Sequence, residues 1–111
     1  AQNDRWPIAD RVRGALVDLM PAGRTGAEDA ALALGISRST LQRRMRDAGT
    51  SYQMILDSVR RDMAVRYLTK TSLRVEEIAS VLAYRDANSF SRSFRRWTGQ
   101  SPTAFRQAVI P

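Results

Sequence analysis

The feature that most constrains the fold of this chain is an internal repeat. The pattern Leu41-x-Arg43-x-Met45 returns 49 residues later as Phe90-x-Arg92-x-Phe94. Self-similarity at a fixed period marks one structural unit that occurs more than once. A chain of 111 residues is too short for two domains of ordinary size. The two copies must therefore be small units.

Each copy has the spacing that a helix-turn-helix needs. A small residue precedes a compact turn residue by four positions, Ala31 before Gly35 and Ala79 before Ala83. Two helices that cross at a steep angle approach closely, so a small side chain is needed where they touch. Both matches are in register, and an arginine-bearing helix follows each. The alternative interpretation is an ordinary seven-helix bundle with arginines on its solvent face.

Apolar residues recur with helical periodicity throughout, and no strand is expected. The first helix is expected at 8–20, the long fourth helix at 52–69 and the fifth at 75–82. Thr25 and Glu28 match a capping box for the second helix. Single side chains are expected to cap the third, fourth, sixth and seventh helices. These four caps are Ser37, Ser51, Asp86 and Ser101.

Composition excludes most enzyme classes. The chain has no cysteine and no histidine, which removes disulfides, thiolate or imidazole metal ligands and imidazole catalysis. Glu76 and Glu77 are adjacent, so they point to different sides of a helix and do not form an acid–base pair. The net charge is +7, which favours a module that binds a polyanion. We expect no enzyme activity, cofactor, metal or membrane-spanning segment.

Residues 78–102 closely resemble the second helix-turn-helix signature of AraC/XylS-type transcriptional regulators, including the terminal G-x-S-P element. The first copy, at 34–51, fits the same family. The joining helix also fits, with Arg60, Ala64 and Leu68 at the family's spacing. The resemblance covers roughly residues 24–106.

The resemblance implies an all-α fold of about seven helices, with two helix-turn-helix subdomains joined by a long central helix. Residues 1–111 would form one DNA-binding domain, with subdomains at 6–50 and 71–109 and the linker helix at 51–70. It implies sequence-specific binding of double-stranded promoter DNA by a bacterial transcription regulator, with recognition helices in successive major grooves. RNA polymerase is an expected partner, and the expected location is the cytoplasm, in association with the nucleoid. The resemblance also implies an N-terminal effector or dimerisation domain outside this chain, and the start at Ala1 with a polar segment fits that expectation.

Two residues depart from the family pattern. Ala83 stands where glycine is usual, which disfavours a left-handed backbone conformation at that turn. Arg74 stands where a capping serine is common, so the fifth helix is expected to start weakly unless Ser72 caps it.

The expected DNA contacts come from the outward faces of the second helix of each motif. By resemblance, eight residues fall at base-contacting positions: Arg38, Ser39, Gln42, Arg43, Ala87, Asn88, Ser89 and Arg92. Arginine can bind guanine with two hydrogen bonds, and glutamine or asparagine can do the same with adenine. Four further arginines are expected to contact phosphates: Arg44, Arg46, Arg95 and Arg96.

For several of these residues, roles without base recognition remain as alternatives. Arg43 and Arg92 could contact phosphates alone, and Ser39 and Ser89 could be merely exposed or act as local caps. The aromatic residues Tyr84, Phe90, Phe94 and Trp97 could stack on bases, but their helical spacing opposite the arginines favours the core. The alternative function is a basic helical module that binds a partner protein, a membrane surface or nucleic acid without sequence preference.

Overall fold

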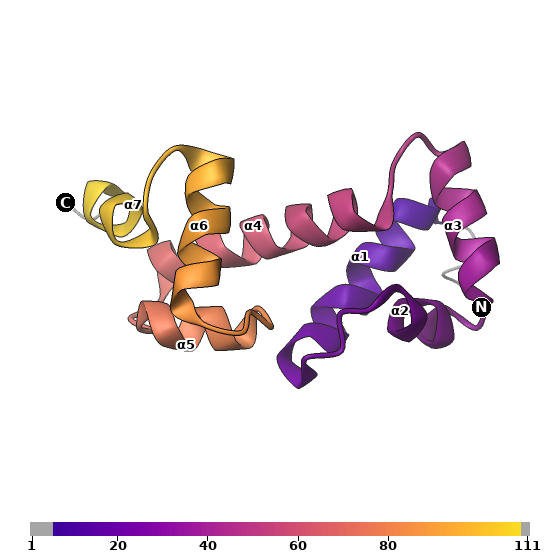
Figure 1. Cartoon of the computed structure of the whole chain (residues 1–111), viewed down its shortest axis with the longest axis horizontal. Coiled ribbons are helices and arrows are strands. Elements are labelled where there is room, and N and C mark those ends of the chain that lie inside the picture. The colour runs from indigo at the N-terminus through magenta and orange to yellow at the C-terminus, as the bar shows by residue number, and fades with distance from the viewer. Residues whose placement is uncertain (1–5, 110–111) are drawn as a thin grey trace. The chain divides into compact units, whose positions relative to one another are not determined.

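The computed structural model describes residues 6–109, and within this range all regular structure is helical (Figure 1). The expected all-α class is confirmed. The chain forms two compact units that divide at the Val59–Arg60 bond, inside α4. The elements are α1 (Ile8–Leu19), the 3₁₀ turn η2 (Met20–Ala22), α2 (Ala27–Leu34), α3 (Arg38–Asp47), α4 (Tyr52–Lys70), α5 (Val75–Val81), α6 (Ala87–Thr98) and α7 (Pro102–Val109).

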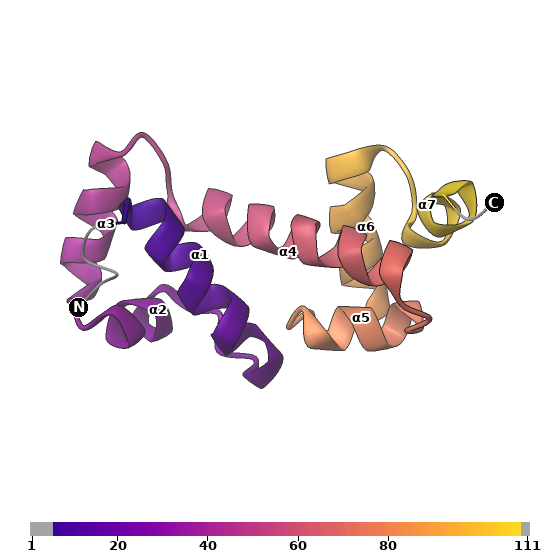
Figure 2. The same ribbon diagram turned by 180° about the vertical axis from the view of Figure 1, so that it is seen from behind.

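The first unit consists of α1, α2, α3 and the start of α4 (Figures 1 and 2). α2 and α3 are the helix-turn-helix pair, and α1 packs against both. Leu16 of α1 is fully buried with Leu41 and Met45, which are the apolar stripe of α3. The hydroxyl of Tyr52 donates to the carbonyl of Thr25 at 2.7 Å and so ties the start of α4 to the loop before α2.

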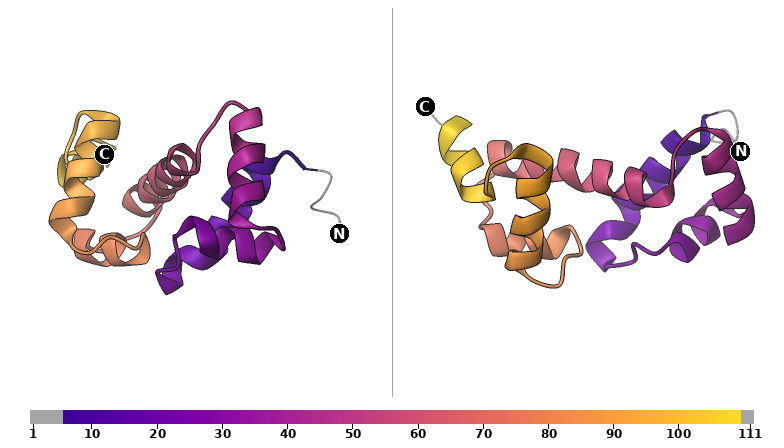
Figure 3. Two further views of the ribbon diagram at one scale, coloured as in Figure 1. Left: turned by 45° about the vertical axis from the view of Figure 1, so that its right-hand side comes forward. Right: turned by 45° about the horizontal axis from the view of Figure 1, so that its top comes forward.

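The second unit consists of the end of α4 with α5, α6 and α7, in which α5 and α6 are the helix-turn-helix pair and α7 packs against α6. α6 lies steeply across α5, as Figures 1 and 3 show. The core is aromatic here: Phe90 and Phe94 are fully buried, and the ring of Phe94 lies 5.2 Å from that of Phe105 in α7. The two small residues expected at the helix crossings, Ala31 and Ala79, are buried in their respective units.

The turns of the two motifs have the same hydrogen bonds. In the first, Ile36 N donates to Ala31 O and Gly35 N to Leu32 O. The corresponding bonds in the second join Tyr84 to Ala79 and Ala83 to Ser80. This pattern closes a helix through one residue in the left-handed conformation.

The expectation for Ala83 was therefore wrong. Gly35 has a φ of 71°, and Ala83 has a φ of 62°, the only positive φ at a residue other than glycine between residues 6 and 109. The turn imposes the left-handed conformation, and the alanine adopts it despite the clash between its Cβ and the backbone.

We predict that Ala83→Gly stabilises the protein by about 1 kcal/mol, because glycine adopts a positive φ without strain. Gly35→Ala is the matched control. A Cβ on Gly35 would meet no atom within 4 Å. It should therefore cost a similar amount through backbone strain alone. Urea unfolding of both variants measures the two effects, and a less stable Ala83→Gly protein would contradict the prediction.

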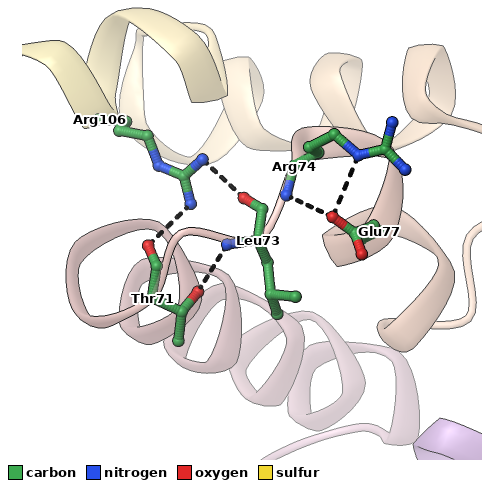
Figure 4. Close-up of polar contacts among 5 residues, drawn as sticks. All are labelled: Thr71, Leu73, Arg74, Glu77 and Arg106. Atoms are coloured by element: carbon green, nitrogen blue, oxygen red, sulfur yellow. Dashed lines mark hydrogen bonds and ion pairs between the residues drawn. The ribbon is translucent and has the colours of Figure 1, made fainter.

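Two helix starts differ from their expected caps. α2 begins after Gly26, not Thr25, and the Asp29 carboxylate accepts from Gly26 N at 3.2 Å. The capping box of Thr25 and Glu28 was therefore wrong by one position. α5 begins after Arg74, so Ser72 is not its cap. Glu77 accepts from both the backbone N (2.9 Å) and Nε (3.2 Å) of Arg74, as Figure 4 shows.

The other expected caps are confirmed. Ser51 accepts from Met54 N at the start of α4, and Ser101 accepts from Ala104 N at the start of α7. Within the described range, no helix has both the length and the hydropathy of a membrane-spanning segment.

Arg106 of α7 caps the end of α4, a role that the sequence did not predict. Its guanidinium donates to the carbonyls of Leu68 (3.0 Å) and Tyr67 (3.2 Å) in the last turn. It also donates to those of Leu73 (2.6 Å) and Thr71 (3.3 Å) just after the helix, as Figure 4 shows. The last carbonyls of a helix have no partner within the helix, and a cation is favoured there. Arg106 therefore fixes α7 to the end of α4 and is unsuited to contact a ligand.

Candidate nucleic-acid interface

α3 is held by a side-chain cap at its start. Ser37 Oγ accepts from Thr40 N at 3.1 Å, as the sequence predicted. The apolar side chains of Leu41 and Met45 face the core of the first unit. The opposite side of the helix is therefore fixed towards solvent.

The exposed face of α3 carries the side chains that the sequence selected. Ser39, Gln42, Arg43 and Arg46 are all exposed, and helical spacing places them on one side of α3. Among the residues that the structure describes, no hydrogen-bond or ion-pair partner is found for the side chains of Gln42, Arg43 and Arg46. Arg44 is also exposed but lies to one side of this face.

Arg38, at the first position of α3, differs from these neighbours. Its Nη1 lies 3.1 Å from Oε1 of Glu28 in α2. Both side chains are exposed, at 55% and 78% respectively. The sequence placed Arg38 correctly at the start of the exposed face but gave no sign of this ion pair.

α6 begins with the expected cap. Asp86 Oδ1 accepts from Ser89 N at 2.7 Å. This hydrogen bond lowers the pKa of the Asp86 carboxyl below its usual value, with smaller contributions from the nearby cations Arg85 and Arg92. The carboxylate is therefore the stable form when the helix is formed, and it suits the positive end of the helix dipole.

The exposed face of α6 borders an open hollow of about 380 Å³. It is lined by Asn88, Ser91, Arg92 and Arg95 of α6 and by Ser101 before α7. Every lining side chain is either cationic or a hydrogen-bonding group, and none is acidic. Such a surface suits an anionic, hydrogen-bonding ligand.

The predicted residues of α6 do not all lie on this face. Ala87 and Ser89 are half-buried, and Ser89 Oγ accepts from Arg92 at 3.4 Å. Ser91 lines the hollow but was not predicted. Its position could have been found by register, because it lies 49 residues after Gln42.

Arg60 of α4 binds the turn that precedes α6, a second role that the sequence did not predict. The sequence placed it only at the family's spacing in the joining helix, and the structure shows that it is half-buried. Its Nε and Nη2 donate to the carbonyls of Leu82 (2.9 Å) and Ala83 (3.1 Å). The guanidinium carbon also lies 4.4 Å from the ring centre of Tyr84. Arg60 therefore holds the turn that sets the direction of α6.

The aromatic side chains belong to the core, as expected. Phe90 and Phe94 are inaccessible, while Tyr84 and Trp97 are half-buried and pack against them. Base stacking on the two phenylalanines is excluded by their burial. Within residues 6–109, no group of acidic side chains is arranged to bind a metal ion.

Comparison with known proteins gives the family. A family model described as a helix-turn-helix domain matches residues 30–108. The ornithine utilization regulator of Pseudomonas aeruginosa is 42% identical over 101 residues, which cover 91% of this chain and 30% of that protein. The regulator VirS of Mycobacterium tuberculosis is 35% identical over 89% of this chain and 29% of its own length. The chain thus spans about a third of the length of these relatives.

Solved structures show the same fold. A DNA-binding transcriptional dual regulator from Escherichia coli K-12 matches with a TM-score of 0.87 at 21% identity, over 95% of this chain and 94% of that chain. The DNA-binding domain of AdpA, solved in complex with a target DNA, matches with a TM-score of 0.74 at 32% identity, over 92% and 91%. The family model covers most of the chain, and the relatives are named as regulators, VirS as a helix-turn-helix transcriptional regulator. The chain belongs to the AraC-type helix-turn-helix domains of transcriptional regulators.

Proposed function

We propose that this chain binds double-stranded promoter DNA with sequence preference, as the DNA-binding domain of a bacterial transcription regulator. The observation that carries the proposal is the pair of capped helices, α3 and α6, whose exposed faces are cationic. The AdpA domain, which is 32% identical, was solved with its target DNA and supports the same role here. We further propose that both units act together as one DNA-binding domain, with α3 and α6 in successive major grooves.

The proposed base contacts are the eight residues selected from the sequence. The residues that are exposed in the structure are the stronger candidates. These are Arg38, Ser39, Gln42 and Arg43 in α3, and Asn88 and Arg92 in α6. The half-buried Ala87 and Ser89 have less surface to offer a base. Arg44, Arg46, Arg95 and Arg96 are the proposed phosphate contacts.

Further partners follow from the family and not from the geometry. We propose RNA polymerase as a partner, and an effector-binding or dimerisation domain in the longer protein. The longer relatives support the latter, because this chain matches about a third of their length. The proposed location is the cytoplasm, in association with the nucleoid, and the proposed activity is binding without catalysis.

Selection of binding sites from a random DNA pool, using this chain, tests the proposal. The selected site should then give a gel-shift band that persists in excess non-specific competitor DNA. A basic module that binds proteins, membranes or nucleic acid without preference would enrich no motif and would lose its band to the competitor.

We predict that Arg43→Ala and Arg96→Ala differ in kind. Loss of Arg43 should cost about 1–3 kcal/mol and relax the preference at one base position, because the lost contact is with a base. Loss of Arg96 should weaken binding to all sequences alike. It should also make the slope of log K against log salt concentration, the salt slope, shallower by about one. Binding assays on the selected site and its single-base variants measure both. If Arg43→Ala keeps the full base preference, Arg43 contacts phosphate alone.

A further inference from the structure

The ion pair between Arg38 and Glu28 is peculiar to the first motif. Arg38 begins α3, Glu28 is the second residue of α2, and their pair spans the turn between these helices at 3.1 Å. In the described range, no other polar side chain on the exposed face of α3 or α6 is paired with a different helix. The remaining hydrogen bonds on these faces stay within one helix.

The internal repeat shows what the second motif lacks. Glu76 is the second residue of α5, as Glu28 is of α2, and Ala87 begins α6, as Arg38 begins α3. Glu76 is exposed, and no residue of the described range pairs with it. The acidic residue is therefore present in both motifs, but only the first has a cation within its reach.

We propose that Glu28 is a positioning residue that makes Arg38 selective for a base, an inference that rests on the proposed function. A guanidinium has five N–H donors, and Glu28 engages one of the two at Nη1. Enough donors remain for the two acceptors that guanine presents in the major groove. Glu28 thus fixes the orientation of a long side chain that would otherwise sample many rotamers.

Charge gives a second reason for selectivity. A free arginine at the start of a recognition helix binds any phosphate, whatever the sequence. The carboxylate of Glu28 repels phosphates and cancels much of the long-range attraction of Arg38. Hydrogen bonds to guanine do not need that net charge. The pair therefore weakens the contact that carries no sequence information and keeps the one that does.

The test is Glu28→Gln in the whole chain, which keeps the side-chain shape and removes its charge. The base position read by Arg38 is first identified as the one whose preference Arg38→Ala relaxes. Glu28→Gln should lower the discrimination at that position about twofold to fivefold, the range expected for an exposed ion pair. Affinity for non-specific DNA should rise, and the salt slope should steepen by about one.

Glu76→Gln is the matched control, because it removes the same charge at the same helical position without a cationic partner. Glu76→Gln should raise the affinity for all DNA sequences by the same factor and leave every base preference unchanged. In an Arg38→Ala background, Glu28→Gln should no longer alter the preference, since its effect acts through Arg38. The thermal midpoints of all variants report whether each protein is folded.

Two results would overturn the inference while leaving the proposed function intact. One is an unchanged preference at every position in Glu28→Gln. The other is a sharper preference, which would mean that Glu28 withholds Arg38 from DNA. If the unmodified chain itself shows no sequence preference, the proposed function fails, and this inference fails with it.

Discussion

Raising the salt concentration from 50 to 200 mM should weaken specific DNA binding by this chain about a thousandfold, as expected when about six phosphates are neutralised. Arginines displace the counterions that condense on DNA, and each contact adds close to one unit to the slope of log K against log salt. The four proposed phosphate contacts, Arg44, Arg46, Arg95 and Arg96, supply four of these contacts, and the exposed cations Arg43 and Arg92 bring two more charges to the DNA surface. The slope should therefore be near −5, as an estimate from the same contact count.

Replacing Arg95 and Arg96 measures how much of the slope comes from the second motif. The variant with both changed to glutamine should have a slope shallower by about two, because each arginine contributes about one unit. The base preference should stay as it was. Titrations at four salt concentrations measure the slope for both proteins. A slope shallower than about −2 for the unmodified chain would contradict a contact surface that includes both motifs.

The sequence predicted most of the fold because its signals are local. Helix caps depend on one side chain and a backbone N–H three residues later, and Ser37, Ser51, Asp86 and Ser101 all act as predicted. The repeat then showed that two such sets form the same motif. Its register also aligned α3 with α6, residue by residue, although the equivalence of Ser91 to Gln42 was not used to predict Ser91.

The sequence-based predictions failed where contacts between residues distant in sequence determine the position of a side chain or the conformation of a turn. Arg60 and Arg106 look like surface charges in sequence, yet each donates to carbonyls at the end of another helix. Which arginine finds such carbonyls depends on tertiary packing, and no local pattern encodes it. Ala83 is a similar case. Its side chain disfavours a positive φ, but the hydrogen bonds of the turn require one.

The candidate site was predictable in position but not in detail. Periodicity identified the outward faces of both helices, because buried Leu41 and Phe90 fix the opposite sides. It could not reveal that Arg38 is paired with Glu28, since ten residues and a turn separate them. Selectivity in such a site depends on these partners as well as on the residues that face the DNA.

Phe94→Ala should have the largest effect on stability of any single change considered, about 3–5 kcal/mol, the usual cost of truncating a buried phenylalanine. The Phe94 ring is fully buried and lies within 6.4 Å of the rings of Phe90, Trp97 and Phe105. It therefore joins α6 to α7. A helical unit of this size has a core that rarely supplies more than about 3–5 kcal/mol. Fixed packing of α6 should be lost.

The matched variant is Met45→Ala, because Met45 occupies the same place in α3, 49 residues earlier, and is also buried. Its cost should be about 2–5 kcal/mol. Hydrogen exchange resolved by residue distinguishes the two variants. Phe94→Ala should lose protection in α5, α6 and α7, while Met45→Ala should lose it in α1, α2 and α3.

The DNA protected from cleavage should shrink to a different half of the selected site in each variant, since each keeps one recognition helix. If both variants lose protection evenly along the whole chain, the two units unfold as one, and base contacts by one motif would depend on the folding of the other.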